Sequence, residues 1–195
     1  MPMKNEKASL LFTELVGHFL VATPQMSDPQ FNQAVIFMCK HDKQTAMGLV
    51  LNKPKKNFTF SKLTKKLSFI EPQFEQNRVI YNGGPSENKR GYILHSDEHL
   101  MPDSIKISDE VALSMQVDML SEIANGIGPA RFKIMLGYTG WAAGQLEEEL
   151  RNNMWIHVPA FPEMIFTDDI GSVWEKALGY CGFNASNLSP QSGWA

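Results

Sequence analysis

The stretch Lys133–Leu150, with the sequence KIMLGYTGWAAGQLEEEL, runs from apolar residues through three glycines into an acidic, amphipathic segment. The apolar residues before the first glycine are typical of a β-strand, and the glycines are typical of a turn. The pattern predicts a strand at 132–136, a turn at 137–140 and a helix at about 141–152. A short strand, MWIHVP at 154–159, would complete a strand, helix, strand crossover unit.

This glycine-rich stretch has two interpretations, an anion site and a structural turn. A helix that begins after glycines can bind a phosphate, because its free backbone N–H groups and its dipole favour negative charge. However, GYTGWAAG has neither the Lys-Ser or Lys-Thr pair of a P-loop nor the Gly-x-Gly-x-x-Gly pattern. Glu147, Glu148 and Glu149 also add negative charge nearby. The residues favour the structural turn, with Trp141 packed in the core.

The rest of the chain contains runs that are typical of strands and helices. Residues 34–40 and 46–52 predict a central hairpin, and residues 78–81 and 91–95 predict two strands around a Gly-Gly-Pro loop. This mixture predicts an α+β fold with a mixed sheet. The remaining predicted elements are a strand at 17–23 and helices at 60–70, at 108–125 and at 170–180.

The composition is that of a soluble globular protein. The chain has 195 residues, of which 43% are hydrophobic and 20% are charged, and this is enough for the core of one domain. We therefore expect a single domain over residues 1–195, with flexible tails at 1–15 and 184–195. The net charge of −3 gives no whole-molecule attraction for DNA or RNA, so direct nucleic-acid binding is not expected. Polar residues interrupt the apolar N-terminal run, which favours a cytoplasmic protein with neither a signal peptide nor a membrane anchor.

The cysteines and histidines give weak signals for catalysis or metal binding. Cys39 and His41 lie two residues apart, so a nucleophile and a base could share one side of a strand, but a core cysteine explains the same pattern. Cys39 and Cys181 match no zinc or redox spacing, and free thiols are favoured over a disulfide. His95 and His99 have a metal-ligand spacing only within a helix, and their sequence favours a turn. No metal and no cofactor is predicted.

The loop NGGPSENKRGY, at residues 82–92, also has two interpretations. Its glycines and the cations Lys89 and Arg90 could bind an anionic ligand through backbone N–H groups and positive charge. A hairpin loop with a charged tip explains the same residues. The hairpin loop is the favoured interpretation.

Four blocks of sequence occur in the order GHFLVATPQMSDPQF, AMGLVLNKP, YNGGP with GYILHS, and LGYTGWAAGQLEEELRNNMWIHVPA. Together they resemble the bacterial AlgH/YqgE family from about residue 17 to residue 160, and SVWEKALGYCG resembles its C-terminal helix. The resemblance implies a compact α+β fold in which helices surround a curved, mixed and largely antiparallel sheet. The family has no established enzymatic activity. Its common label, transcriptional regulator, comes from a genetic link to alginate control rather than from a DNA-binding element.

The resemblance implies shared motif residues rather than assigned roles. Ser86 stands where valine is usual in the family, so a fixed apolar contact of this loop is not implied. Lys53 stands where arginine is frequent, so a required bidentate arginine contact is not implied either. The candidate ligand-site or motif residues are Asn52, Gly83, Gly84, Pro85, His95, Gly137, Gly140, Trp141 and Gln145.

Three functions are compatible with the sequence. The favoured one is a non-enzymatic regulatory or interaction protein that works through a protein partner or a small ligand. The alternative is an enzyme or binding protein for a small anionic ligand, with Gly83, Gly84 and the 137–144 turn as walls of the pocket. In that case His95 would act as acid or base and would lie within about 10 Å of Gly137. DNA binding has support only from a lysine cluster, which consists of Lys53, Lys55, Lys56, Lys62, Lys65 and Lys66.

Overall fold

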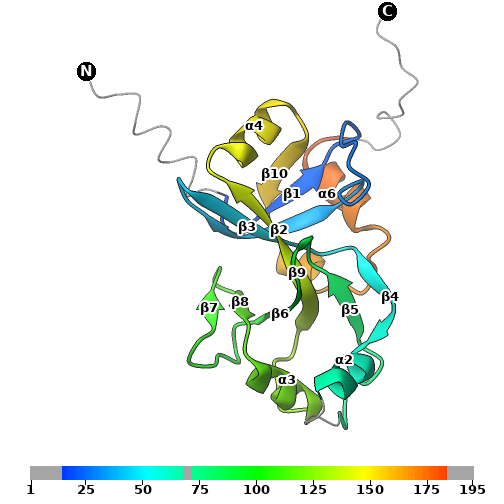
Figure 1. The fold of residues 1–195 in the computed structure, drawn as a ribbon. Helices are drawn as coiled ribbons and strands as arrows, with labels where there is room; N and C mark the ends of the chain where they lie inside the picture. Colours follow the sequence, from blue (N-terminus) through cyan, green and yellow to red (C-terminus); the bar gives the residue numbers. More distant parts are fainter. Residues whose placement is uncertain (1–14, 68–71, 184–195) are drawn as a thin grey trace, which may run out of the picture. The chain divides into compact units, whose positions relative to one another are not determined.

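The computed structural model describes residues 15–67 and 72–183 of the chain (Figure 1). The tails predicted at 1–15 and 184–195 lie outside these residues, apart from Leu15, which is buried. None of the helices in the described ranges is long and apolar enough to cross a membrane. The described residues group into two compact units, and the single-domain organisation stays a prediction. Unit 1 takes its residues from 1–52 and 140–195, and unit 2 takes its residues from 53–139.

Unit 1 is built on a four-stranded antiparallel sheet with the order β10-β1-β2-β3. The predicted central hairpin is confirmed, because β2 and β3 pair with Ile36 opposite Val50. A β-bulge interrupts this pairing between Met38 and Lys40. The strands are β1 (His18–Ala22), β2 (Val35–His41), β3 (Thr45–Val50) and β10 (Trp155–Pro159).

Helices cover the sheet of unit 1. The helix α4 (Gln145–Arg151) places Leu146 in a core cluster with Ile36 and Met38, because its apolar side chain faces the sheet. The helix α6 (Val173–Tyr180) packs against β1 and β2, and the indole of Trp174 donates a hydrogen bond of 2.7 Å to the carbonyl of Ala22. A short helix, α5 (Pro162–Ile165), precedes α6.

Unit 2 contains a mixed sheet with the order β4-β5-β9-β6-β8-β7. Of these pairings, β5 with β9 is parallel and the others are antiparallel, which confirms a mixed and largely antiparallel sheet. Helices lie beside the sheet in each unit, so the predicted α+β class is confirmed as well. The strands are β4 (Pro54–Thr59), β5 (Val79–Asn82), β6 (Ser86–Ser96), β7 (Ile105–Lys106), β8 (Val111–Ser114) and β9 (Phe132–Ala142), whose last three residues belong to unit 1.

Two helices, α2 (Phe60–Leu67) and α3 (Val117–Ala124), cover one face of the sheet in unit 2. The apolar side chains of α2 recur at helical spacing, which is why one side of this helix is buried and its lysine-rich side is exposed. The core between helices and sheet consists of Phe60, Leu63, Ile80, Ile93, Met119, Leu120, Ile123, Ala124, Phe132, Ile134 and Leu136.

The turn predicted at 137–140 is wrong, because β9 continues through these residues. Gly137 has a φ of 76°, a conformation that glycine adopts without steric cost, so the strand bends there and does not end. The helix predicted from residue 141 begins only at Gln145, after Gly144 with a φ of 77°. Gly137 and Gly140 therefore belong to a long strand, whereas Gly144 lies in the turn directly before the helix.

Two other predictions in unit 2 are also wrong. Residues 111–114, predicted as helix, form the strand β8, because they pair with β6 on one side and with β7 on the other, and all four residues are buried. The following helix α3 therefore starts at Val117, although it ends at Asn125 as predicted. The strands β5 and β6 do not form a hairpin, because β9 pairs with both of them. The 83–85 loop thus connects two strands that are not neighbours.

Candidate functional site

Three of the predicted glycines come together in unit 2. A Cβ atom on Gly84 would lie 2.2 Å from the carbonyl carbon of Tyr138, and one on Gly137 would lie 2.5 Å from the carbonyl oxygen of Gly84. Gly83 donates its N–H to the carbonyl of Leu136 at 2.9 Å. The backbone of the 83–85 loop therefore touches the backbone of β9 directly. These two segments fill the space in which an anionic ligand would have to bind.

Two other motif residues, Pro85 and Asn52, belong to different units. Pro85 is exposed and leads into β6. Asn52 belongs to unit 1, where its side chain accepts a hydrogen bond from the N–H of Val35 at 3.0 Å and donates one to the carbonyl of Gln33 at 2.8 Å. Asn52 thus fixes the segment that enters β2, which is a structural role.

Trp141 and Gln145 hold a carboxylate in unit 1. The indole N–H groups of Trp141 and Trp155 donate to Oε2 of Glu149 at 2.8 and 2.7 Å, and the Gln145 amide donates to Oε1 at 3.0 Å. Trp141 is buried, as predicted, while Gly140 before it is exposed. Because three donors bind this carboxylate, the cluster anchors α4, and the negative charge of Glu149 disfavours an anion at this position.

Cys39 and His41 do not form a catalytic pair. His41 contacts Glu147 of α4, with 2.9 Å between its Nε2 and the carboxylate Oε1. The Cys39 thiol donates instead to the carbonyl of Phe37 at 3.6 Å, and burial raises the pKa of this thiol well above its ordinary value. A thiol that stays protonated is a poor nucleophile, so Cys39 is the core residue that the sequence favoured.

His95 lies away from the glycines. It pairs with Phe132 across β6 and β9, whereas Gly137 is five residues further along β9. At a strand rise of about 3.3 Å per residue, the separation is about 16 Å. His95 and Gly137 therefore do not line one pocket, and the alternative that required them to be close loses its geometric basis.

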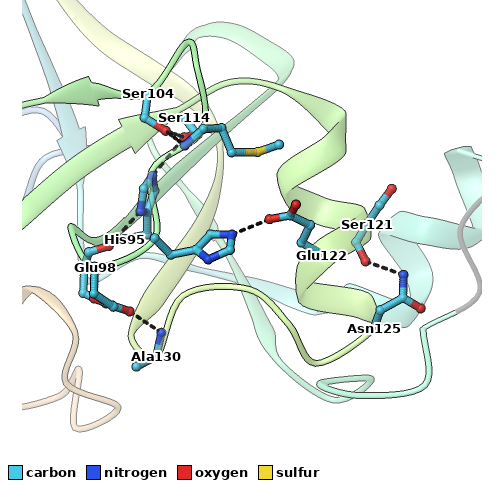
Figure 2. A network of polar contacts seen from close by, with 11 residues as sticks. His95, Glu98, Ser104, Ser114, Ser121, Glu122, Asn125 and Ala130 are labelled. Atoms are coloured by element: carbon cyan, nitrogen blue, oxygen red, sulfur yellow. Dashed lines mark hydrogen bonds and ion pairs between the residues drawn. The ribbon is translucent and has the colours of Figure 1, made fainter.

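His95 instead belongs to a chain of polar contacts inside unit 2, which Figure 2 shows. Its side chain is completely buried, with Nδ1 2.9 Å from the carbonyl oxygen of Ser96 and Nε2 2.9 Å from Oγ of Ser114. Oγ of Ser114 is 2.8 Å from Oγ of Ser104, which accepts the N–H of Met101 at 2.9 Å. This hydroxyl chain, formed by His95, Ser114 and Ser104, is the candidate functional site.

The partners of His95 determine its protonation. Because a carbonyl oxygen can only accept, Nδ1 carries the proton toward Ser96 and the neutral ring leaves Nε2 as an acceptor. Burial lowers the pKa of His95 below its ordinary value of 6.5, more than its contact with the Ser96 carbonyl and the nearby carboxylates raise it. His95 is therefore neutral at pH 7 and can act as a base but not as a permanent cation.

A second group of contacts holds the loop after β6. Glu98 accepts hydrogen bonds from the Ser96 hydroxyl at 2.9 Å and from the N–H of Ala130 at 2.6 Å. Partial burial opposes ionisation of Glu98, but these donors keep its pKa below the ordinary value. His99 contacts Glu122 of α3. The loop is thus tied both to the start of β9 and to α3.

Sequence reasoning missed both serines of the hydroxyl chain. Ser114 is the polar residue of an otherwise apolar strand, and a buried polar group needs a hydrogen-bond partner. That signal could have indicated a partner for Ser114, but the segment was predicted as helix. Ser104 carries no local signal. No group of three or more His, Cys, Asp or Glu side chains within residues 15–67 and 72–183 is arranged to hold a metal.

Comparison with known proteins identifies the family. The model of a family described as AlgH-like matches residues 19–186. The chain belongs to the AlgH-like family. A UPF0301 protein of Rhizobium rhizogenes is 41% identical over 188 residues, which cover 93% of each chain. One of Pseudoalteromonas translucida is 39% identical and matches 93% of this chain and 98% of its own length.

Solved structures support the AlgH-like fold. The solution structure of AlgH from Pseudomonas aeruginosa is 39% identical, with a TM-score of 0.77, and the match covers 93% of this chain and 96% of AlgH. A crystal structure of a protein from Corynebacterium diphtheriae is 18% identical with a TM-score of 0.68, which shows similarity of fold alone. The names of these relatives state no activity, so the function has to be argued from this chain.

Proposed function

We propose that this AlgH-like protein is a regulatory or interaction protein that binds a partner through a basic face on β4 and α2. The observation that carries the proposal is a separation of charge. Residues 53–67 contain six lysines, no acidic residue and no arginine, although the whole chain has a net charge of −3. The basic face consists of Lys55, Lys56, Lys62, Lys65 and Lys66.

The structure of the basic face favours binding through charge. Lys56, Lys62, Lys65 and Lys66 are exposed, and α2 packs against β4, where Lys66 lies over the ring of Phe58. The strand β4 lies at an edge of its sheet, where it could in principle accept another strand. However, Pro54, the lysines and an irregular register make β4 a poor template for strand addition. An acidic surface is therefore the partner chemistry that this face fits.

Two contacts favour an acidic protein over a nucleic acid. Lys66 lies 4.9 Å above the ring of Phe58, which occupies the aromatic face on which a base would stack. Lys62 donates to the carbonyl of Asn57 at 2.7 Å, which leaves it less free to follow a phosphate backbone. The face also has no arginine for bidentate phosphate contacts. These features support an acidic protein segment as the partner.

The test compares two triple variants in affinity purification from native lysate. The basic-face variant carries Lys56→Glu, Lys65→Glu and Lys66→Glu, and we expect it to lose a protein that the unmodified chain retains reproducibly. The matched control carries the same change at exposed lysines elsewhere, namely Lys40, Lys43 and Lys89. A partner that both variants retain, or tighter binding of a duplex or single-stranded oligonucleotide than of any protein, would contradict the proposal.

We further propose that the basic face acts by binding alone, without a catalytic step at this face. This part of the proposal is supported by the closed contacts of the glycines and by the protonated thiol of Cys39. A thermal-shift screen against metabolites tests it, since a ligand at 100 times its dissociation constant adds about 2.7 kcal/mol of stability. A metabolite that the unmodified protein converts and the basic-face variant no longer converts would contradict this part.

A further inference from the structure

The hydroxyl chain of unit 2 has a fixed direction. Ser114 has one hydroxyl proton, which it donates to Nε2 of His95 because that nitrogen can only accept. Toward Ser104, therefore, Ser114 can only accept, so the Ser104 hydroxyl is the donor in the 2.8 Å contact. The N–H of Met101 completes the chain by donating to Oγ of Ser104. Every proton in the chain points toward His95.

Burial divides this chain into an inner and an outer end. His95 and Ser114 are 0% and 1% exposed, whereas Ser104 is half-buried and lies between the turn at 101–104 and β7. The turn holds Ser104 with two backbone contacts, since its N–H donates to the carbonyl of Met101 and its Oγ accepts the N–H of Met101. Ser104 is thus the member of the chain that a molecule in solution can reach.

The arrangement can activate the hydroxyl of Ser104. Transfer of its proton to Ser114, together with transfer of the Ser114 proton to His95, would leave negative charge on Oγ of Ser104. The N–H of Met101 would stabilise that charge, and the Ser96 carbonyl would stabilise the charged imidazole through Nδ1. A nucleophile joined to a base through hydrogen bonds is the arrangement of covalent catalysis, although here a second hydroxyl lies between the two.

We propose that Ser104 is a nucleophile for acyl transfer, with Ser114 as the relay and His95 as the base, and that its substrates are esters or thioesters of apolar carboxylic acids. The choice of an apolar acyl group rests on the side chains beside Ser104 in the sequence. Leu100 and Ile105 are 53% and 48% exposed, so they offer apolar surface on both sides of Ser104 in the sequence. This inference is independent of the partner bound at the basic face.

The reaction balances with the groups present. Oγ of Ser104 bonds to the acyl carbon while protons move from Ser104 to Ser114 and from Ser114 to Nε2 of His95. The bond from the acyl carbon to the leaving oxygen or sulfur then breaks, and the leaving group takes a proton from the Ser114 hydroxyl, which regains one from Nε2 of His95. Water attacks the resulting acyl-serine ester with His95 again as base, which releases the acid and restores Ser104.

The test uses an alkyl fluorophosphonate, which reacts with activated serines and releases fluoride. With the full-length chain we expect one label per molecule, found at Ser104 by peptide mass spectrometry, and slow hydrolysis of p-nitrophenyl butyrate. Ser104→Ala abolishes both. The matched control is Ser108→Ala at an exposed serine nearby, which leaves labelling unchanged.

Further variants distinguish an activated Ser104 hydroxyl from one that is merely accessible to solvent. Ser114→Ala breaks the relay and should slow labelling of Ser104 by about 100-fold, the lower end of the effect of a general base. Ser114→Thr keeps a hydroxyl and should restore labelling to within about tenfold of the original rate. The proposal is overturned if Ser104 is labelled no faster than Ser108. It is equally overturned if folded Ser114→Ala is labelled at the original rate.

Discussion

The two units of this protein bury polar groups in different ways. In unit 1 the carboxylate of Glu149 accepts hydrogen bonds from two indoles and one amide. In unit 2 a neutral imidazole and two hydroxyls form a line that ends at the half-buried Ser104. A carboxylate that accepts from three donors can anchor a helix, but it does not form a line along which a proton could move. A directed chain of neutral groups can do so, which is why the reactive site is proposed in unit 2.

The units also differ in how their long elements are joined. Unit 1 attaches α4 through side chains, namely Glu149 to the indoles and Glu147 to His41. Unit 2 joins the 83–85 loop to β9 through direct backbone contact at Gly84 and Gly137. A side-chain contact can be weakened in steps, whereas backbone contact leaves no room for a single methyl group. The predicted effects of substitutions follow this difference.

The largest effect is expected at Gly84. Gly84→Ala would place a methyl group 2.2 Å from the carbonyl carbon of Tyr138 at a φ of 153°. Overpacking and backbone strain together should lower the free energy of unfolding by about 4 kcal/mol. Urea unfolding followed by circular dichroism measures this. Gly91→Ala in β6, with no heavy atom within 4 Å of the added carbon, is the matched control and should change stability by less than about 1 kcal/mol.

A smaller loss is expected at Glu149. Glu149→Ala leaves the buried indole N–H groups of Trp141 and Trp155 without their acceptor and should cost about 3 kcal/mol. Glu149→Gln keeps an oxygen that can accept both and should cost about half as much. Urea midpoints and near-ultraviolet circular dichroism of the tryptophans report the change. If the exposed neighbour substitution Glu148→Ala is as costly, the carboxylate cluster is not the anchor of α4.

In unit 2, Ser114→Ala should cost about 2 kcal/mol, since it removes the partner of Nε2 of His95 and of the Ser104 hydroxyl. Ser114→Thr should recover most of this loss, because it returns a hydroxyl to the same position. Thermal and urea unfolding of both variants measure the loss of stability and its recovery. Equal stability of Ser114→Ala and the unmodified chain would mean that the chain of hydrogen bonds contributes little to the fold.

The smallest effect is a pH dependence from His95. Burial lowers its pKa in the folded chain, whereas the unfolded chain titrates near 6.5. Below that value the unfolded chain binds more protons than the folded chain, so the free energy of unfolding falls as the pH decreases from 6.5 toward the folded pKa. His99 adds to this lowering, while Glu98 and Asp97 oppose it.

Urea midpoints between pH 7.5 and pH 5 measure this dependence. His95→Gln should remove part of the loss of stability at low pH. The matched substitution of the exposed His157 by Gln should leave this loss unchanged. If the urea midpoint of His95→Gln falls as much with pH as that of the unmodified chain, the pH dependence comes from other groups.

Local patterns predicted the elements whose neighbours in space are also neighbours in sequence. The hairpin of β2 and β3, the apolar stripe of α2 and the end of α3 at Asn125 follow from alternation, helical spacing and a capping glycine. The wrong predictions concern residues whose partners lie far away. Ser114 is in a strand because β6 and β7 lie on either side of it, and that pairing has no local signature.

The candidate site shows the same limit. His95 was selected from a motif, but the expected partner Gly137 is about 16 Å away along the sheet. The actual partners, Ser114 and Ser104, carry little local information, because a serine is compatible with a strand, a turn or a helix cap. Trp141 was placed correctly in the core, since a large aromatic residue at the end of an apolar strand gains most from burial.

The sequence by itself determined the α+β class, the family and the basic composition of residues 53–67, because these depend on local pattern and residue content. Only the tertiary structure decided what the glycines and the buried polar residues do. Gly137 bends a strand because Gly84 lies against it, and His95 is a neutral acceptor because Ser96 and Ser114 fix its tautomer. Such roles depend on contacts between distant segments, and these contacts exist only once the chain has folded.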